Sequence, residues 1–564
     1  MSNKSYNPVK PWLNSYQDGV PEHINYETLT LPDYLERAVQ EFPENPALNF
    51  MGYTLTYKQL NHMVMQFAAF LYKSGIRKGD RVALVMPNVI PCVAAYYAIL
   101  RIGGVVVLNN PLYTDTELLH QFKNSDSKAV VVLDLLANRV IGLRDKCSIG
   151  TVVVTSIGDY LPFPKSILFP LVAKKKKLAA HVDKGPSVYF WKDVIREKYA
   201  ETPKVTVTFD DLAALQYTGG TTGVSKGAML SHGNLSKQVQ QIRAWFPAFT
   251  MGTETMLGAL PFFHVFGMSS AMNLAVMLAW NDVLVPKPQP EPLLETIKEY
   301  RPTFAPLVPT MYIGMINDSM INKVDMSCLK GCFSGSAPIP VEVIHEFQAK
   351  TGSLIVEGFG MTETSPVTHI NPFVEGRTKV GSIGVPISDT ECRIVDIDTG
   401  EDVKPGEPGE LLIRGPQVMR GYWNMPEETE NVFTDGWLHT GDIARMDDDG
   451  YYYIVDRLKD MIINGGLKVY PRDVDEVLYQ HPAVQDACTI GVPHEVKGET
   501  VKSFVVLKKG SAATQNELVE FCKQKLAGYK LPSEIEFRET LPRSAVGKIL
   551  RRELRDDELK RRKQ

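Results

Sequence analysis

The sequence predicts an α/β fold with three parts: a large N-terminal α/β domain, a β-rich subdomain and a small C-terminal α+β domain. Between residues 31 and 133, apolar strand-like segments alternate with amphipathic helical segments, which is typical of a parallel sheet. From Gly381 onward, short strand candidates are separated by Gly, Pro and Asp turns, which indicates a β-rich subdomain. The last stretch of about 100 residues has a pattern of its own and suffices for a small domain.

The elements of the N-terminal part can be assigned in order. Apolar residues at helical spacing predict a helix over 31–41, with Pro32 near its start. The expected elements that follow are a strand at 55–57, a helix at 57–73, a strand at 81–86, a helix at 89–102, a strand at 104–108, a helix at 114–125 and a strand at 129–133.

The later elements give the domain boundaries. Strands are expected at 391–395, 409–413 and 450–455, then a helix at 473–479, strands at 484–490 and 501–507, and a helix at 517–527. The charged stretch 456–460 is the natural boundary. We therefore expect an N-terminal domain at 1–456, with its β-rich subdomain at about 381–456, and a C-terminal domain at 457–564.

Composition excludes several classes of protein. The chain has 564 residues, 44% hydrophobic and 22% charged, and its net charge of −4 gives no sign of nucleic-acid binding. Seven cysteines and the lack of a secretory leader predict reduced thiols and a cytoplasmic location. No uninterrupted apolar run reaches the about 20 residues of a membrane span.

The segment 159–177 interrupts the strand–helix alternation. It is apolar, is broken by prolines and ends in the run Lys174–Lys177. Such a charge run is usually a solvated face, and this interpretation stands slightly ahead. The alternative is peripheral contact with the anionic inner surface of a membrane.

The stretch Tyr217–Gly227 has the chemistry of a phosphate cradle. It contains four glycines, three threonines, a serine and Lys226. Glycines let backbone N–H groups approach an anion closely, hydroxyls add donors and the lysine adds a positive charge. A flexible surface turn is the alternative, which the density of hydroxyls ahead of a lysine disfavours.

Two familiar nucleotide loops do not fit this stretch. Gly227 follows Lys226, so the hydroxyl that a kinase-type phosphate loop places after its lysine is missing. The dinucleotide spacing G-x-G-x-x-G is also absent. The loop therefore predicts nucleotide phosphate binding in another fold.

Further motifs follow in a fixed order. They are Pro261–Gly267 with its histidine, the small-residue turn Ser334–Pro338, Glu357–Thr364, Trp437–Asp442 and Pro542–Leu550 with Lys548. Together with Tyr217–Gly227 they resemble the acyl-adenylate-forming superfamily over roughly residues 28–555. Within it, Trp423–Thr429, Asp435–Ile443, Asp456–Ile463 with Val469–Pro471, and the insert around 160–165 are similar to bacterial long-chain fatty-acid–CoA ligases of the Gram-positive type.

The resemblance implies a two-step ligation. ATP and a long-chain fatty acid give acyl-AMP and pyrophosphate, and the thiol of coenzyme A then displaces AMP. The first step brings two negative groups together, so cations and hydrogen-bond donors must offset the repulsion. The implied cofactors are ATP, Mg²⁺ and coenzyme A.

The resemblance also implies roles for single residues. Lys548, Thr218, Glu363 and His264 are expected to be catalytic, with Glu363 and Thr218 at Mg²⁺. The acyl site is expected at Trp245, His264 and Ser334, and coenzyme A at Gly465, Gly466 and Lys468. A hinge at Lys459 makes the C-terminal domain mobile between the half-reactions. The expected ATP and AMP contacts are Thr218, Gly219, Gly220, Thr221, Thr222, Gly223, Ser225, Lys226, Gly335, Ser336, Ala337, Glu357, Gly358, Phe359, Gly360, Met361, Thr362, Asp442, Ile454, Arg457 and Lys548.

Each role has a structural alternative. The alternative for Glu363 is an exposed carboxylate at a helix start, and that for Asp442 is a turn residue. The alternative for Lys548 is a surface lysine in a basic tail, and that for His264 is a core histidine with its hydrogen bonds satisfied. Alternatives for the whole chain are a medium-chain or other carboxylic acid–CoA ligase, a fatty acyl-AMP ligase that feeds a carrier protein, and a non-catalytic nucleotide sensor. The sequence itself does not give the oligomeric state, but members of the group that it resembles are often homodimers.

Overall fold

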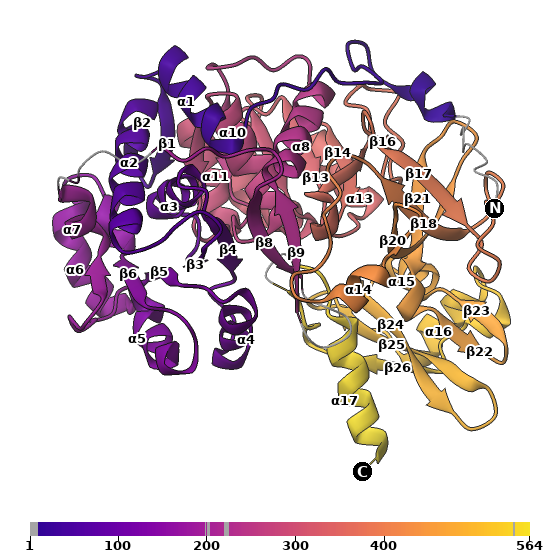
Figure 1. Ribbon diagram of the computed structural model, residues 1–564. Coiled ribbons are helices and arrows are strands. Elements are labelled where there is room, and N and C mark those ends of the chain that lie inside the picture. The colour runs from indigo at the N-terminus through magenta and orange to yellow at the C-terminus, as the bar shows by residue number, and fades with distance from the viewer. Residues whose placement is uncertain (1–9, 198, 200–203, 219–224, 545–546, 564) are drawn as a thin grey trace. The chain divides into compact units, whose positions relative to one another are not determined.

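The computed structural model describes residues 10–197, 199, 204–218, 225–544 and 547–563 (Figure 1). The chain forms two compact units. The large unit comprises Leu13–Glu391 and Arg414–Thr434, and the small unit comprises Met1–Trp12, Cys392–Ile413 and Asp435–Gln564. The predicted α/β architecture is confirmed, whereas the domain boundary at residue 456 stays a prediction.

The large unit contains a seven-stranded sheet in the order β7-β6-β5-β3-β4-β8-β9, which is parallel except for the β8–β9 pair. Its strands are β3 (Arg81–Val85), β4 (Val105–Asn109), β5 (Ala129–Leu133), β6 (Thr151–Thr155), β7 (Val188–Phe190), β8 (Leu212–Thr218) and β9 (Lys226–Ser231).

A nine-stranded sheet in the same unit has the order β16-β15-β14-β13-β12-β10-β11-β1-β2. Its strands are β1 (Pro46–Phe50), β2 (Tyr53–Thr56), β10 (Thr255–Gly258), β11 (Asn281–Leu284), β12 (Phe304–Leu307), β13 (Gly331–Ser334), β14 (Ile355–Gly360), β15 (Val367–Ile370) and β16 (Val385–Pro386).

Helices connect these strands. They are α1 (Leu31–Glu41), α2 (Tyr57–Lys73), α3 (Ile90–Arg101), α4 (Asp115–Ser125), α5 (Asp134–Leu143), α6 (Lys165–Lys176), α7 (Trp191–Arg196), α8 (His232–Trp245), α9 (Val265–Gly267), a π-helical turn (Met268–Asn273), α10 (Leu274–Met277), α11 (Pro290–Tyr300), α12 (Pro309–Asn317), α13 (Val341–Thr351) and α14 (Pro426–Glu430).

The small unit is built on two further sheets. One holds β17 (Glu391–Val395), β18 (Gly409–Arg414), β20 (Trp437–Met446) and β21 (Tyr452–Arg457), with β19 (Phe433–Thr434) where the chain passes between the units. The other holds β22 (Ile462–Asn464), β23 (Leu467–Val469), β24 (Val484–His494), β25 (Gly498–Leu507) and β26 (Glu534–Phe537), with helices α15 (Pro471–Tyr479), α16 (Gln515–Lys523) and α17 (Arg551–Lys563).

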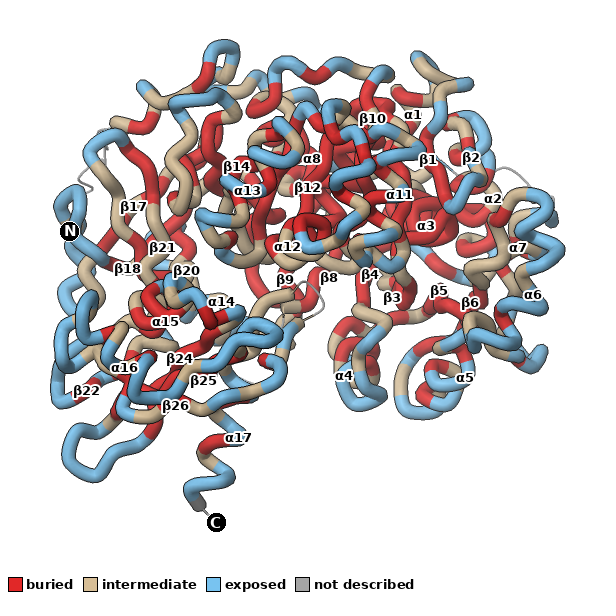
Figure 2. Tube along the Cα trace, turned by 180° about the vertical axis from the view of Figure 1, so that it is seen from behind, coloured by how far each residue is buried: buried red, intermediate tan, exposed pale blue. Residues whose placement is uncertain are grey.

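The strands of the seven-stranded sheet are apolar because helices cover both faces. Every residue of β4, β5 and β6 is buried, and most are valines. Figure 2 shows these strands in red within the unit. Parallel sheets need such continuous apolar runs, since neither face meets water.

Capping residues fix where several helices begin. Thr56 and Gln59 form a capping box at the start of α2, and Thr114 and Glu117 form one at the start of α4. Each box satisfies backbone N–H groups that a helix start leaves without partners. This is why the expected bounds of α2 agree with those in the structure.

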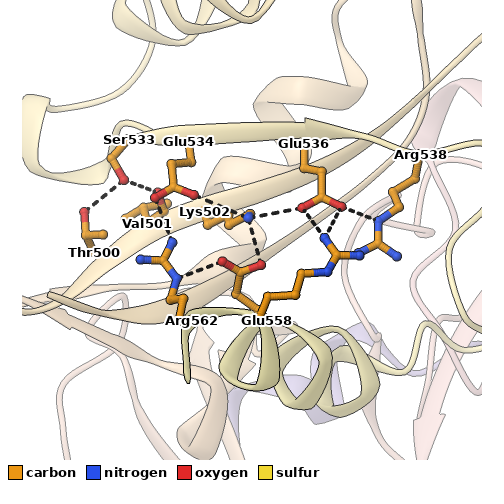
Figure 3. A network of polar contacts seen from close by, with 10 residues as sticks. Thr500, Val501, Lys502, Ser533, Glu534, Glu536, Arg538, Glu558 and Arg562 are labelled. Atoms are coloured by element: carbon orange, nitrogen blue, oxygen red, sulfur yellow. Dashed lines mark hydrogen bonds and ion pairs between the residues drawn. The ribbon is translucent and has the colours of Figure 1, made fainter. Parts of the chain in front are cut away.

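The last helix of the small unit is attached to its sheet through charges (Figure 3). Lys502 Nζ on β25 lies 2.8 Å from Glu558 on α17, 3.1 Å from Glu536 and 3.3 Å from Glu534. Arg562 bonds both Glu558 and Glu534. Burial opposes the charged ammonium, yet these carboxylates still raise the pKa of Lys502.

The interrupted segment 159–177 contains helix α6. Pro170 lies inside it and removes one backbone donor, but a helix of three turns tolerates this on its solvent side. No helix in the described part of the chain is long and apolar enough to cross a membrane.

Candidate active site

The predicted phosphate loop begins on β8 and ends on β9, which form a hairpin. Strands β8 and β9 pair antiparallel, and Thr218 lies directly opposite Lys226. The predicted contacts Gly219, Gly220, Thr221, Thr222 and Gly223 lie outside the described residues. The two ends of the loop are therefore fixed by the sheet, with Thr218 on one strand and Lys226 on the other.

Lys226 lies between an acid and an aromatic ring. Its Nζ forms an ion pair with Glu428 on α14 and lies 5.1 Å from the centroid of the Tyr422 ring. The lysine side chain is only 14% exposed. A cation over an aromatic face gains about 0.5–2 kcal/mol, more when water is excluded.

Tyr422 also contacts the predicted metal ligand. Its hydroxyl donates to Glu363 Oε1 over 2.7 Å. Glu363 lies in the short 3₁₀ turn Thr362–Thr364 and is buried, which disfavours a solvent-exposed helix-start carboxylate. Burial raises the pKa of Tyr422, and the neighbouring Glu363 adds to this effect.

Backbone hydrogen bonds hold the segment 419–423 against both partners. Met229 N donates to Gly421 O over 2.9 Å, and Trp423 N donates to Gly227 O over 2.8 Å. Met419 N donates to Glu363 O over 2.7 Å. This segment is therefore seated between β9 and the turn that carries Glu363, and it places Tyr422 between them.

The predicted ATP and AMP contacts at 335–337 and 357–359 lie near the carboxyl ends of two neighbouring strands. Strands β13 and β14 run parallel, and their last paired residues are Ser334, which ends β13, and Glu357, which lies within β14. Gly335–Ala337 and Gly358–Phe359 come directly after these positions. Ligands of open α/β sheets bind at this edge, so the topology brings the two predicted stretches together.

Close packing explains the glycines after Glu357. A Cβ on Gly358 would lie 2.3 Å from the Phe333 ring, and one on Gly360 would lie 2.0 Å from Pro366 O. Ser336 adopts φ +73°, a left-handed conformation that L-residues rarely take. Backbone strain of this kind gathers at ligand sites.

The remaining residues of this stretch are held by side-chain contacts. Glu357 Oε2 accepts from Gly381 N over 2.7 Å. The Phe359 ring packs edge-on against His369, with centroids 6.0 Å apart, and burial lowers the pKa of His369 to about 3. Because His369 is neutral, Phe359 packs against an uncharged neighbour. Met361 and Thr362 continue toward Glu363, and Thr364 Oγ1 accepts from Met361 N over 3.1 Å.

The predicted acyl residues have different surroundings. His264 is half-buried and caps α9, where Phe266 N donates to its Nδ1 over 3.3 Å. The Phe266 ring lies 3.2 Å from the position of a Cβ on Gly335. Ser334 Oγ is buried without a hydrogen-bond partner among the described residues, and its role at an acyl site stays a prediction.

Trp245 is enclosed by the core of the large unit. Its indole Nε1 donates to Asn371 O over 3.2 Å, and its ring packs edge-on against Tyr16 with centroids 5.1 Å apart. Its role at an acyl site stays a prediction.

In the small unit, Asp442 and Arg457 face each other across two strands. They pair in the register of β20 and β21, and Arg457 Nε lies 3.2 Å from Asp442 Oδ1. Asp442 lies within a strand and is buried, which contradicts a turn position. One group accepts and the other donates, as recognition of ribose hydroxyls requires. Ile454 lies on the same strand β21, and its carbonyl accepts from Arg472 over 2.7 Å.

Lys548 is close to this pair. It is half-buried, and its backbone N donates to Ser544 Oγ over 3.2 Å. Burial lowers the pKa of Lys548 to about 8, and Arg457 contributes in the same direction while Asp442 opposes it. A lysine with such a pKa is unlike one in a solvated basic tail.

The predicted hinge and coenzyme A residues adjoin this strand. Lys459 lies in the 3₁₀ turn Leu458–Asp460 that follows β21. Gly465 and Gly466 form the tip between β22 and β23, with φ +62° and +83°. A Cβ on either would contact nothing within 4 Å, so conformation rather than space favours glycine there. Lys468 Nζ lies 3.3 Å from Asp398.

The structure thus forms two clusters from the predicted residues. Lys226 and Glu363 gather in the large unit, while Asp442, Arg457 and Lys548 gather in the small unit. Sequence reasoning missed Tyr422 and Glu428, which touch Lys226 or Glu363. Both adjoin or lie in the stretch Trp423–Thr429 that carried the family resemblance, which was the available signal.

Among the described residues there is no group of three or more His, Cys, Asp or Glu side chains that could hold a metal. Glu363 is a single carboxylate that Tyr422 links to Lys226. One carboxylate suits Mg²⁺, which keeps several waters and takes phosphate oxygens as further ligands.

Comparison with known proteins identifies the family. The AMP-binding enzyme family matches residues 35–423, and the AMP-binding enzyme C-terminal domain matches residues 473–548. The chain belongs to the AMP-binding enzymes, and the resemblance inferred from the motifs is confirmed.

Individual relatives extend over nearly the whole chain. A "Long-chain-fatty-acid--CoA ligase" of Bacillus subtilis (strain 168) is 44% identical over 552 residues, covering 97% of this chain and 98% of the relative. The ATP-bound structure of MatB from Rhodopseudomonas palustris superposes with a TM-score of 0.82 at 29% identity, covering 94% and 99% of the two chains. The anthranilate CoA ligase AuaEII in complex with anthranoyl-AMP gives a TM-score of 0.83 at 26% identity, covering 95% and 98%.

Proposed function

We propose that this enzyme ligates a long-chain fatty acid to coenzyme A with ATP, through an acyl-AMP intermediate that releases pyrophosphate and then AMP. The observation that carries the proposal is the 44% identity to the Bacillus subtilis ligase over 97% of this chain. The similarity spans both units and therefore includes both clusters.

The geometry supports adenylate chemistry in particular. Lys226 supplies positive charge at the end of the proposed phosphate loop. Tyr422 contacts both Lys226 and Glu363 and so links the two charged groups. The acid carboxylate must approach a negatively charged phosphate, and fixed cations lower the cost of that approach. Lys548, with Asp442 and Arg457 beside it, supplies the second cation and the ribose contacts.

Magnesium is the proposed cofactor, and Glu363 and Thr218 are the residues proposed to hold it. When bound, it would neutralise phosphate charge and orient the oxygens of ATP. Glu363 fits this role, because a buried carboxylate held by one hydrogen bond keeps a second oxygen for a ligand. Thr218, at the end of β8, offers only a neutral hydroxyl.

The proposed function also includes a hinge, a coenzyme A site and an acyl site. The small domain turns at Lys459 between adenylation and thioester formation, and Gly465, Gly466 and Lys468 meet coenzyme A. Trp245, His264 and Ser334 border the acyl chain. The enzyme is cytoplasmic, contacts the membrane surface peripherally and forms a homodimer.

Product analysis tests the function. Purified protein is incubated with ATP, Mg²⁺, coenzyme A and fatty acids of increasing length, and the products are identified by mass spectrometry. We expect acyl-CoA and AMP, with turnover greatest for long chains. Acyl-AMP that accumulates with coenzyme A present would instead indicate an adenylate ligase, and a preference for short acids would reject the long-chain assignment.

A further inference from the structure

Helix α6 and the residues from Tyr160 up to it form a surface segment that packs on the large unit through one side. Trp191 Nε1 donates to the Tyr160 hydroxyl over 2.8 Å, and the ring of Tyr160 packs against Tyr53 with centroids 5.6 Å apart. Leu161 and Ala173 are buried. The inner side of this segment is thus attached to its own unit, beside α7 and near the edge of the sheet formed by β7 and β6 (Figure 1).

The outer side is apolar and exposed. Ile167, Leu168, Leu171 and Val172 are spaced i, i+1, i+4 and i+5, so they share one face of the helix. Their exposed fractions are 66%, 53%, 72% and 42%, and Phe163 just before the helix is 80% exposed. Figure 2 shows α6 mostly in the exposed colour.

The position of Phe169 and Ala173 explains why this face cannot turn inward. Phe169 lies so close to Gly158 that a Cβ there would be 2.4 Å from its ring, and Ala173 is buried on the same side. These inner residues already fill the contact with the unit. The five large apolar side chains on the outer side therefore have no core of their own to join.

Charge at the two ends of the apolar face has a single sign. Lys165 lies at the start of α6, and Lys174, Lys175, Lys176 and Lys177 lie at its end, all exposed. The stretch 160–182 contains five lysines and no Asp or Glu, in a chain whose net charge is −4. The positive end also complements the carbonyl end of the helix dipole.

We propose that this surface, residues 163–177, docks on the anionic surface of a lipid bilayer. Phe163, Ile167, Leu168 and Leu171 enter the acyl boundary, and the lysine run lies against phosphate headgroups. The observation behind the lipid assignment is that apolar and basic residues follow each other along the helix axis, so an obliquely lying helix reaches the acyl boundary and the headgroups together.

A bilayer also fits the surface better than a protein partner. A protein would be recognised by complementary shape and by hydrogen bonds, whereas the outer face of α6 offers only branched or aromatic side chains and mobile ammonium groups. Bilayers accept such side chains without a fixed geometry. The inference rests on the proposed function in one respect, because a long-chain acid dissolves in the membrane and would be met there.

Vesicle co-sedimentation tests the surface. The full-length protein is mixed with vesicles of phosphatidylcholine alone and with vesicles that also contain phosphatidylglycerol. We expect binding to the anionic vesicles that weakens at high salt. Each lysine near such a surface contributes roughly fivefold to partitioning, so replacing all four of Lys174–Lys177 by glutamine should weaken binding by roughly several hundred-fold.

A second variant tests the apolar half separately. Leu171→Asp places a charge on the inserting face and should abolish binding, whereas Leu112→Asp, at a residue that is 77% exposed elsewhere on the large unit, should leave it unchanged. Circular dichroism checks that both variants fold. The proposal would be overturned if wild-type protein does not bind anionic vesicles, or if Leu171→Asp or the variant with Lys174–Lys177 replaced by glutamine binds like the wild type.

Two further measurements separate this proposal from neighbouring ones. Loss of self-association on Leu171→Asp in size-exclusion chromatography without lipid would show that the face meets a second copy instead, and would overturn the lipid assignment. Turnover of detergent-solubilised acid should be equal in all variants, while turnover of vesicle-dissolved acid should fall in Leu171→Asp and in the lysine-to-glutamine variant but not in Leu112→Asp. Failure of both turnovers in the wild type would reject the ligase function, and co-sedimentation would still decide the surface.

Discussion

The hydroxyl of Tyr422 donates a 2.7 Å hydrogen bond to Glu363 Oε1, and the ring of the same tyrosine faces Lys226 Nζ at 5.1 Å. One side chain therefore touches both the carboxylate proposed for magnesium and the cation proposed for pyrophosphate. It acts on ATP only through these two partners and is a positioning residue.

Replacing Tyr422 by phenylalanine should separate these two contacts. The ring stays beneath Lys226, but Glu363 loses a hydrogen bond of the kind worth about 1.5–3 kcal/mol. We expect the Mg²⁺ concentration for half-maximal adenylation to rise about tenfold, with a smaller change in turnover at saturating Mg²⁺. Pyrophosphate exchange over a Mg²⁺ titration measures this.

Tyr479→Phe is the matched control, because Tyr479 also bonds a carboxylate, Asp486, over 2.5 Å within the small unit. Its Mg²⁺ titration should follow the wild type. An equal shift in both variants would show that loss of a tyrosine hydroxyl acts through stability alone.

The ion pair between Glu428 and Lys226 is expected to compete with phosphate for the lysine. Glu428→Gln removes the ion pair and leaves the ammonium freer to bind phosphate, so the KM for ATP should fall and pyrophosphate should leave more slowly. Lys226→Ala should lower kcat/KM for adenylation on the order of 100-fold. Glu430→Gln, on the same helix and exposed, should change neither value. A higher KM for ATP in Glu428→Gln would contradict this competition.

Lys548 should give adenylation a pH limit. Its pKa is about 8, so the ammonium loses its proton and its charge as the pH rises through that value, and pyrophosphate exchange should decline. Stability has the opposite sign: between about 8 and 10.5 the unfolded chain holds this proton and the folded chain does not, so this residue favours folding more as pH rises.

Variants of Lys548 identify the group that titrates. Lys548→Arg stays charged and should lose the decline above pH 8, whatever its rate. Lys548→Ala should lose adenylation but still convert supplied acyl-AMP to acyl-CoA. A pH profile of Lys548→Arg with the wild-type decline would assign the titration to another group.

Lys459 is expected to absorb the turn of the small domain. Proline fixes φ, so Lys459→Pro should retain pyrophosphate exchange and lose thioester formation. Lys459→Ala keeps the backbone free and should retain both half-reactions. Equal loss of both in Lys459→Pro would place the hinge elsewhere.

The closely packed glycines that follow Glu357 should tolerate no side chain. Gly360→Ala places a Cβ 2.0 Å from Pro366 O, a backbone atom that cannot step aside, and should lower the melting temperature by several degrees or prevent folding. Gly142→Ala, in helix α5 with nothing within 4 Å of the added carbon, should instead stabilise by about 0.5–1 kcal/mol. Calorimetry on both variants compares them directly.

Local signals made part of this fold accessible from sequence. The run Val105–Leu108 predicts a buried strand because each of its residues is apolar, and Thr56 marks the start of α2 because its hydroxyl caps the helix. Such features depend on neighbours in the chain. The order of the motifs added the family, and with it the identity of Lys226 and Glu363.

The contacts of Tyr422 depend on distant segments instead. It is 59 residues from Glu363 and meets Lys226 only because 419–423 lies along β9. The sequence of Gly421–Trp423 does not indicate which strand this segment forms hydrogen bonds with. The lowered pKa of Lys548 was equally inaccessible, since it follows from burial beside Arg457 rather than from the residues that adjoin the lysine.

The ionic attachment of α17 is separable from the sheet beneath it. Without the helix beyond Leu554, Glu558, Arg561 and Arg562 leave together, and Lys502 with Arg538 still balances Glu534 with Glu536, two charges against two. The sheet is thus electroneutral on its own at this face. Helix α17 follows the segment that ends in Lys548 and helps to hold it on the sheet. We therefore expect that shortening the chain from its C-terminus loosens that lysine before it disturbs the strands.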